Sequence, residues 1–427
     1  MTLLTTHSSL RTEIVTNPGA IDADAWDGLL ATQAQPTPFM RHAYLAALHT
    51  SASACPATGW TPCFVLLWDG DALAAACPLY LKTHSYGEYV FDWAWARAYQ
   101  EHGLEYYPKA LIAVPFTPVP GTRLLARNAQ ARALLLQSVL AWCQAQELSS
   151  LHLLFGSEQD LEACREAGLM QRTTVQFHWK NAVASAASAA SAASADSAAQ
   201  TLRYPNYEAF LASLTQEKRK KVRQEQRRVA DAGVQFRWAR GQDITAQDWA
   251  FFYRCYERTY LEHGNAPYLS PAFFQRMAGD MPESWLMFTA ERNGQAIATS
   301  LIAVSACPAS ARGQKDLKNC TATAYGRYWG ALERVDNLHF DACYYQPIRW
   351  CIEHGFDVFE GGAQGEHKMA RALMPQATHS AHWLAHPAFA DAVERFLVRE
   401  GAGLSDYLAE LQTRTPFRGA PPATPIP

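Results

Sequence analysis

The stretch "WLMFTAERNGQAIATSLIAV", residues 285–304, decides the fold expected for this chain. Two apolar runs flank the dipeptide Asn293-Gly294, which favours a tight two-residue turn between antiparallel strands. The first half of the chain holds a similar stretch, "CFVLLWDGDALAAACPLYLK", residues 63–82, with Asp69-Gly70 at its turn. We therefore expect a β-hairpin in each half of the chain.

Each hairpin is followed by a helix and then by a short buried strand. In the first half, residues 129–148 have the apolar spacing of an amphipathic helix, and "LHLLF" at 151–155 is typical of a strand. In the second half, residues 339–355 predict a helix that includes Pro347, and "FDVFEGG" at 356–362 predicts the next strand. Two units of similar order indicate an internal duplication, with an α+β fold that contains mixed sheets.

The length of 427 residues also favours two domains over one compact core. Residues 182–200 consist almost wholly of Ala and Ser and have no apolar face, so we expect a linker there. The predicted organisation is a first domain at 1–181, this linker, a second domain at 201–400, and a C-terminal helix with a Pro-rich tail at 401–427. A second insertion, residues 305–322, is expected to form a long hairpin loop.

Composition limits the function classes. The formal net charge is −3, so an interaction with nucleic acid would depend on a local basic patch. The 10 cysteines include no CxxC pair and several lie in apolar runs, which favours buried thiols in a reducing compartment. The chain has neither a secretory signal at its start nor about 20 consecutive apolar residues, so we expect a cytoplasmic protein.

One basic patch is present, at residues 214–234. It has seven Lys or Arg within residues 217–228, on a strongly helical stretch. Such a helix suits contact with the phosphates of RNA, a nucleotide cofactor or a lipid head group. A solvated helix with weak surface ion pairs is the alternative.

Three stretches are rich enough in polar groups to carry chemistry. Residues 82–125 combine Gly and Pro breaks with many rings and ionisable groups, and predict loops around a cavity, or an aromatic core with satisfied tyrosines. Residues 325–345 place Arg327 beside two rings and two glycines, which we interpret as a strand-to-helix turn able to present N–H groups to an anion. The third stretch, "FEGGAQGEHKMAR" at 359–371, combines three glycines with Glu366, His367 and two cations.

Several site classes are not expected. The sequence contains neither HExxH nor a GxSxG elbow, and neither Walker nor dinucleotide glycine patterns occur near Arg327. His379, His382 and His386 have the spacing of one helical face, but no carboxylate or thiolate lies beside them in the sequence. We therefore predict no metal site and no tightly bound cofactor.

Taken together, these stretches resemble the FemAB-like proteins labelled "peptidoglycan biosynthesis/recognition", a branch of the GNAT acyltransferase superfamily. The resemblance rests on "GEYVFDWAWA", "YYPKALIAVPFTPVPGTRLL", "KRKKVRQEQRR", "YGRYWG", "LHFDACYYQPI" and "FEGGAQGEHKMAR". It implies two tandem GNAT-like (acyl-CoA N-acyltransferase) domains. The acyl-CoA loop of classical GNAT enzymes is absent, so the resemblance leaves acyl-CoA and aminoacyl-tRNA both open as donors, the latter through residues 217–228.

The leading hypothesis is an acyl- or aminoacyltransferase that forms an amide on an amine acceptor, such as a cell-wall precursor or another small molecule. Glu366 or His367 would deprotonate the amine, with Asp341 orienting or sharing that role. Donor and acceptor binding is predicted for a larger set: Tyr107, Lys109, Arg327, Tyr328, Trp329, Gly362, Gly365, Lys368 and Arg371. The alternatives are a non-catalytic module that binds cell-wall fragments or another anionic ligand, and RNA binding through the basic helix.

Overall fold

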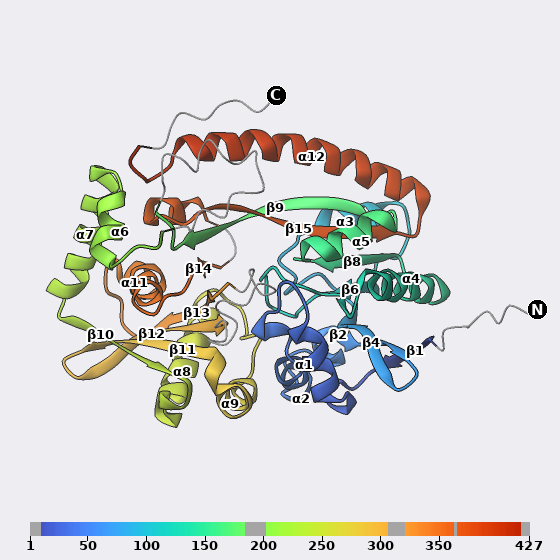
Figure 1. Ribbon diagram of the computed structural model, residues 1–427, viewed down its shortest axis with the longest axis horizontal. Coiled ribbons are helices and arrows are strands. Elements are labelled where there is room, and N and C mark those ends of the chain that lie inside the picture. Colours follow the sequence, from blue (N-terminus) through green and yellow to red (C-terminus); the bar gives the residue numbers. More distant parts are fainter. Residues whose placement is uncertain (1–9, 184–201, 306–320, 363–364, 420–427) are drawn as a thin grey trace, which may run out of the picture. The chain divides into compact units, whose positions relative to one another are not determined.

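The computed structural model describes residues 10–183, 202–305, 321–362 and 365–419 of the chain. It divides into two compact units (Figure 1). Unit 1 contains residues 1–174, 268–277 and 378–402, and unit 2 contains residues 175–267, 278–377 and 403–427. The units are interleaved in sequence, whereas the predicted domains are consecutive. The Ala/Ser linker from residue 184 onward and most of the 305–322 loop lie outside the described residues.

Unit 1 has two groups of paired strands. One has the order β1-β3-β4-β7 and the other contains β15-β8-β6-β5-β2. The strands of unit 1 are β1 (Leu10–Val15), β2 (Trp60–Pro62), β3 (Phe64–Asp69), β4 (Ala72–Cys77), β5 (Leu79–Lys82), β6 (Lys109–Ile112), β7 (Leu125–Ala126), β8 (Ser150–Leu154) and most of β15 (Met374–Leu384). Its helices are α1 (Ala23–Ala31), α2 (His42–Thr50), α3 (Trp93–Glu101), α4 (Ala129–Ala145), α5 (Glu158–Glu166), most of α9 (Pro271–Asp280, up to Met277) and the first part of α12 (Pro387–Thr413).

Unit 2 contains the strand order β10-β11-β12-β13-β14-β9. Its strands are β9 (Met170–Lys180, from Val175 on), β10 (Val234–Arg240), β11 (Trp285–Arg292), β12 (Gln295–Ser305), β13 (Thr323–Ala331) and β14 (Val358–Glu360). Its helices are α6 (Tyr207–Ser213), α7 (Gln216–Asp231), α8 (Ala246–Glu262), α9 (Pro271–Asp280, from Ala278 on), α10 (Leu338–Phe340) and α11 (Gln346–Glu353).

Local sequence explains these elements. Asn293 and Gly294 have φ of 53° and 73°, as the turn between β11 and β12 requires, and the predicted hairpin is confirmed. Thr215 caps α7 by accepting a hydrogen bond from the backbone N–H of Lys218, which confirms the predicted basic helix. Where α8 crosses β13, a Cβ on Gly330 would lie only 2.0 Å from the carbonyl oxygen of Cys255, so glycine lets the helix pack closely.

The helix predicted around Pro347 is present, but it is not uniformly α-helical. Residues Asp341–Tyr345 form a π-helical turn between α10 and α11. Pro347 has no backbone N–H to donate to the preceding turn, and a wider turn is one way for a helix to absorb that loss. The core of unit 2 lies beside it, with Tyr344, Tyr345 and Ile348 among its buried residues.

Two sequence interpretations are wrong. Arg327 lies inside β13 and not in a strand-to-helix turn, because β13 continues to Ala331 along β12. His379 and His382 lie in β15, an extended strand, so the three-histidine helical face does not exist. None of the helices among the described residues is long and apolar enough to cross a membrane.

Candidate active site

The candidate site begins where two neighbouring strands of unit 2 stop pairing. β14 runs parallel to β13 and pairs with it only from Thr323 to Tyr325. β13 then continues to Ala331 with its other edge still paired to β12. After Glu360 the chain turns away through Gly361 and Gly362, and Gly362 has a φ of 78°. The two strands therefore separate beyond Tyr325.

A β-bulge widens this opening. Leu301 of β12 pairs with Tyr328, and the next residue, Ile302, pairs with Gly326. Arg327 is therefore the extra residue on β13, and a bulge of this kind bends a strand and redirects its side chains. A Cβ on Gly326 would lie 3.2 Å from the carbonyl oxygen of Glu360, so glycine keeps the two strands close just before they separate.

The opening is a pocket of about 290 Å³. Residues from β12, β13, the π-turn and the segment after β14 form its wall: Ser300, Leu301, Ile302, Gly326, Arg327, Tyr328, Trp329, His339, Cys343, Tyr344, Gly361, Gly362, His367 and Lys368. The volume is at the small end of ligand sites in proteins, which suits one reacting group and its neighbours.

His367 is a titratable group on the pocket wall. It lies in a 3₁₀ helix, Glu366–Arg371, and its Nε2 is 3.4 Å from the hydroxyl oxygen of Tyr344. Partial burial and the cations of Arg371 and Lys368 lower the pKa of His367 below its usual value. The ring is therefore neutral at pH 7 and able to accept a proton. Burial raises the pKa of Tyr344, which keeps its hydroxyl protonated.

Lys368 adds a buried amine to the same wall. Its Nζ donates to the carbonyl oxygen of Gly362 at 3.0 Å. Burial lowers the pKa of Lys368 to about 8. The amine is still mostly cationic at pH 7, and it loses its charge within reach of physiological pH. Arg327 is the second cation of the wall, with its guanidinium 5.3 Å from the ring centre of Tyr328.

His339 is a neutral part of the wall. Its ring contacts Trp329 edge-on at 5.5 Å and Tyr344 at 5.7 Å. Burial, with His367, Arg371 and Lys368 nearby, lowers the pKa of His339 to about 4. The ring therefore packs as an uncharged aromatic group at neutral pH.

The structure brings together Arg327, Tyr328, Trp329, Gly362, His367 and Lys368 from the predicted set. Glu366 is instead exposed and accepts hydrogen bonds from the hydroxyl of Tyr407 at 2.7 Å and from Arg414 at 3.4 Å. Gly365 precedes the 3₁₀ helix without lining the pocket. Residues 363 and 364, between Gly362 and Gly365, lie outside the described residues.

Arg371 and Asp341 are buried behind the pocket wall. Arg371 donates to both carboxylate oxygens of Glu225 at 3.0 Å, and its guanidinium lies 3.4 Å from the ring centre of Phe340. Asp341 accepts a hydrogen bond from Gln346 at 3.0 Å, and burial raises the pKa of Asp341 to about 6. Both side chains therefore hold the helix and the 3₁₀ turn that carry the pocket residues.

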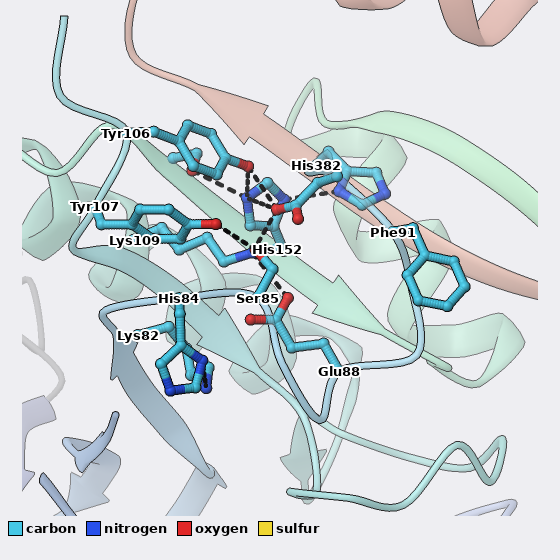
Figure 2. A network of polar contacts seen from close by, with 12 residues as sticks. Lys82, His84, Ser85, Glu88, Phe91, Tyr106, Tyr107, Lys109, His152 and His382 are labelled. Carbon is cyan, nitrogen blue, oxygen red and sulfur yellow. Dashed lines mark hydrogen bonds and ion pairs between the residues drawn. The ribbon is translucent and has the colours of Figure 1, made fainter. Parts of the chain in front are cut away.

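Tyr107 and Lys109 belong to unit 1, in a separate buried network (Figure 2). Lys109 is fully buried and its Nζ donates to Ser85 and Glu88 at 2.8 Å each, and also to Asp92. The hydroxyl of Tyr107 lies 2.8 Å from Ser85 Oγ. Several ionisable groups of residues 82–125 are thus part of one network, in which internal carboxylates already engage Lys109.

The predicted set lacks eight of the fourteen residues that line the pocket, among them His339, Cys343 and Tyr344. All three lie in or next to the π-turn, where the sequence shows only a helix with a proline. An aromatic-rich helix is normally read as core, and the extra residue of a π-turn leaves no clear pattern. Among the described residues, no group of three or more His, Cys, Asp or Glu is arranged to hold a metal ion.

Comparisons with known proteins agree with this architecture. The family model FemAB-like, described as peptidoglycan biosynthesis/recognition, matches residues 18–419. A crystal structure of FemX is similar with a TM-score of 0.51 at 10% identity, covering 90% of this chain and 100% of that one. L-PGS from Bacillus licheniformis is similar with a TM-score of 0.50 at 9% identity, covering 90% and 99%.

A tandem GNAT protein from the clavulanic acid biosynthesis pathway is also similar, with a TM-score of 0.44 at 10% identity, covering 89% and 99%. No curated protein matches the chain. The fold is similar to those of FemX and L-PGS, and its helices and mixed sheets agree with the α+β class expected from the sequence.

Proposed function

Because the chain belongs to the FemAB-like family, we propose that unit 2 transfers an acyl or aminoacyl group onto an amine and forms an amide. The observation that carries this proposal is a neutral imidazole, His367, on the wall of a pocket that opens between two separating strands. A neutral base beside a small pocket that also holds cations suits the attack of an amine on an activated carbonyl.

The reaction assigns a role to each group. The neutral acceptor amine attacks the carbonyl carbon of the donor, and His367 Nε2 accepts the proton that the amine nitrogen loses. As the tetrahedral intermediate collapses, the bond to the donor's sulfur or oxygen breaks and an amide remains. Tyr344, within 3.4 Å of His367 Nε2, donates a proton to the leaving group and recovers it from the imidazolium.

The cations of the pocket wall hold the anionic part of the donor. Arg327 and Lys368 offer charged donors to a phosphate, and both acyl-CoA and aminoacyl-tRNA carry phosphates. This proposal keeps His367 as the base. It gives Asp341 and Arg371 positioning roles and leaves Glu366 outside the reaction, because none of the three lines the pocket.

The basic helix favours aminoacyl-tRNA as the donor. Val222, Glu225 and Val229 face inward at helical spacing, which leaves most of the seven cations of residues 217–228 exposed. Among the described residues, the ion pairs on this helix include Lys218 with Glu217 and Arg223 with Glu208, both at its surface. A row of exposed cations suits the backbone of a nucleic acid, with an affinity that falls steeply as salt increases.

A donor-binding assay followed by a transfer assay tests the proposal. The melting temperature is measured with acetyl-CoA, with a longer acyl-CoA and with mixed aminoacyl-tRNA. A donor at about 100 times its Kd adds about 2.7 kcal/mol of stability, which shifts the melting temperature by a degree or more. The donor that binds is then incubated with peptide and cell-wall precursor amines, and amide products are measured by mass spectrometry.

His367→Gln provides the decisive variant. We expect transfer to fall by about 10² or more, with donor binding nearly unchanged, because loss of a general base typically costs 10²–10⁴. His263→Gln is the matched control, since His263 is an exposed histidine of unit 2 outside the pocket. Equal transfer by wild type and His367→Gln contradicts the proposal. Binding of a donor or of cell-wall fragments without any amide product favours a recognition module instead.

A further inference from the structure

Unit 1 contains a second concentration of ionisable groups, which the proposed transfer does not use. The loop from Thr83 to Asp92 connects β5 to α3 and turns its acidic side chains inward (Figure 2). Glu88 and Asp92 are both buried, and both accept hydrogen bonds from Lys109. Burying two carboxylates and a lysine is costly unless every polar atom finds a partner.

The two carboxylates differ in the number of hydrogen-bond donors that contact them. Asp92 Oδ2 accepts from Lys109 and also from the hydroxyl of Tyr106 at 2.7 Å. Burial opposes the ionisation of Asp92, but Lys109 and the other donors outweigh it and lower the pKa of Asp92. Glu88 has Lys109 as its donor, and burial raises the pKa of Glu88 to about 7. Glu88 therefore lacks the additional donor that Asp92 has.

Two carboxylate oxygens in this network have no hydrogen-bond partner. They are Glu88 Oε1 and Asp92 Oδ1, and both are buried. An orphaned buried acceptor costs about 1–3 kcal/mol, and more when it is charged, so a missing donor is the natural explanation. Lys109 forms ion pairs with both carboxylates, and its Nζ lies 2.8 Å from Glu88 Oε2. One positive charge is thus shared between two carboxylates.

Lys82 does not supply the missing donor. Its Nζ donates to the carbonyl oxygen of Tyr86 at 3.3 Å and lies 3.5 Å from His84 Nδ1 and 3.7 Å from the ring centre of Trp60. These contacts direct the Lys82 amine toward Tyr86, His84 and Trp60. Burial lowers the pKa of Lys82 to about 7, so this lysine readily gives up its charge when another cation approaches.

We propose that this network is a binding site for a primary ammonium group, which donates hydrogen bonds to Glu88 Oε1 and Asp92 Oδ1. The missing partner must be a donor, because both orphan atoms accept. A cation neutralises the second carboxylate, whereas an anion would be repelled. The site is independent of the proposed transfer reaction and rests on unit 1 alone.

Exposed rings on this loop and at the start of α3 strengthen this assignment. Tyr86 is 60% exposed, Phe91 53% and Trp93 39%, which is unusual for large aromatic residues. The rings of Tyr86 and Trp93 lie 5.0 Å apart at 61°. Aromatic faces attract ammonium groups through cation–π interactions, so these rings suit the first contact of such a ligand. In this proposal, a ligand would reach the buried oxygens through a shift of the Thr83–Asp92 segment.

The pH dependence arises from the groups that surround Glu88. They come from β5, the loop, β6, β8, β9 and β15: Lys82, His84, Asp92, Tyr106, Tyr107, Lys109, His152, Arg172 and His382. Burial lowers the pKa of His152 to about 3 and also lowers that of His382, so both are neutral. Glu88 ionises and Lys82 loses its proton as pH rises through about 7. Both changes strengthen ammonium binding.

The test compares two cations at equal ionic strength. Methylammonium chloride has three N–H donors and stays protonated up to about pH 10, like a lysine side chain. Tetramethylammonium chloride has the same charge and no N–H. We expect methylammonium to raise the melting temperature of the full chain more than tetramethylammonium does. Its Kd at pH 6 should be about tenfold weaker than at pH 8, because about one Glu88 in ten is ionised one pH unit below its pKa.

Glu88→Gln should weaken methylammonium binding by tenfold or more, whereas Glu101→Gln, an exposed glutamate of α3, should leave the Kd unchanged. His367→Gln should also leave the Kd unchanged, so failure of the transfer proposal does not affect this result. Equal effects of the two cations, or a Kd that does not depend on pH between 6 and 8, would mean that only water fills the site and would overturn the proposal. The pH comparison uses wild type and therefore holds even where Glu88→Gln does not fold.

Discussion

In unit 1, β6 pairs antiparallel with β5 on one edge and parallel with β8 on the other; in unit 2, β13 pairs in the same way with β12 and β14. The two parallel pairs differ at the ends of their strands. In unit 2 the strands separate around a pocket. In unit 1 the guanidinium of Arg123 lies at the end of β8, where it donates to the carbonyl oxygens of Leu154 and Gly121 at 3.2 Å each, and to Val119.

A second difference concerns anions. In unit 1 the carboxylate of Asp160 accepts hydrogen bonds from the backbone N–H groups of Arg123 at 2.7 Å, Leu124 at 3.1 Å and Ser157 at 3.0 Å. The chain thus provides its own anion beside its own arginine. In unit 2 the pocket wall has cations and glycines, to which the proposed function assigns a donor phosphate. The strand ends of unit 1 are thus bonded to internal side chains, whereas those of unit 2 border a pocket.

The largest expected effect is that of Arg123→Leu on stability. The substitution leaves three buried carbonyl oxygens without this donor, and each orphaned buried acceptor typically costs about 1–3 kcal/mol, so we expect a loss of about 3 kcal/mol or more. Urea denaturation measures the loss in the free energy of unfolding. Arg127→Leu is the matched control, because Arg127 is half exposed and pairs at the surface with Asp69, so its loss should cost about 1 kcal/mol or less. Similar losses for both variants would remove the structural role given to Arg123.

Lys368→Met should weaken donor binding by about tenfold, since one charge-assisted hydrogen bond contributes about 1.5–3 kcal/mol. The pH dependence checks the cause. Lys368 is cationic below its pKa of about 8 and neutral above it, so donor affinity of wild type should fall as pH rises through 8. Calorimetric titration at pH 7 and pH 9 should show this fall in wild type and in Lys180→Met, a variant of an exposed lysine. If donor affinity falls by the same factor between pH 7 and pH 9 in Lys368→Met, the pH dependence arises from another group.

The acidic side of the pH profile tests His367 itself. The pKa of this histidine is lowered from its ordinary value of 6.5, so at pH 6.5 the ring is already mostly neutral and able to accept a proton. The transfer rate should therefore be more than half its maximum at pH 6.5, and decline only at lower pH. Initial rates at saturating donor between pH 5 and pH 8 give the midpoint. A midpoint above pH 6.5 would be incompatible with the lowered pKa.

The sequence predicted those structural features that depend only on neighbouring residues. The Asn293-Gly294 turn and the Thr215 cap need only neighbouring residues, and both are where the sequence placed them. The opening beyond Tyr325 depends on strand register and on a one-residue bulge, which no local pattern reports. The partners of Lys109 come from residues 17 to 24 positions earlier, so its burial among carboxylates needed the folded chain.

Glu366→Gln should have the smallest effect, although Glu366 and His367 are adjacent. A 3₁₀ helix has three residues per turn, so consecutive side chains point about 120° apart. His367 lines the pocket, whereas Glu366 bonds to Tyr407 and Arg414 at the surface. We expect a transfer rate within twofold of wild type and a loss of stability below about 1 kcal/mol, typical of an exposed ion pair. Transfer rates and urea denaturation are measured for Glu366→Gln and His367→Gln side by side. They show which of the two side chains takes part in transfer. A loss of transfer in Glu366→Gln as large as in His367→Gln would show that the segment turns its carboxylate to the substrate, and the contrast drawn between the two residues would fail.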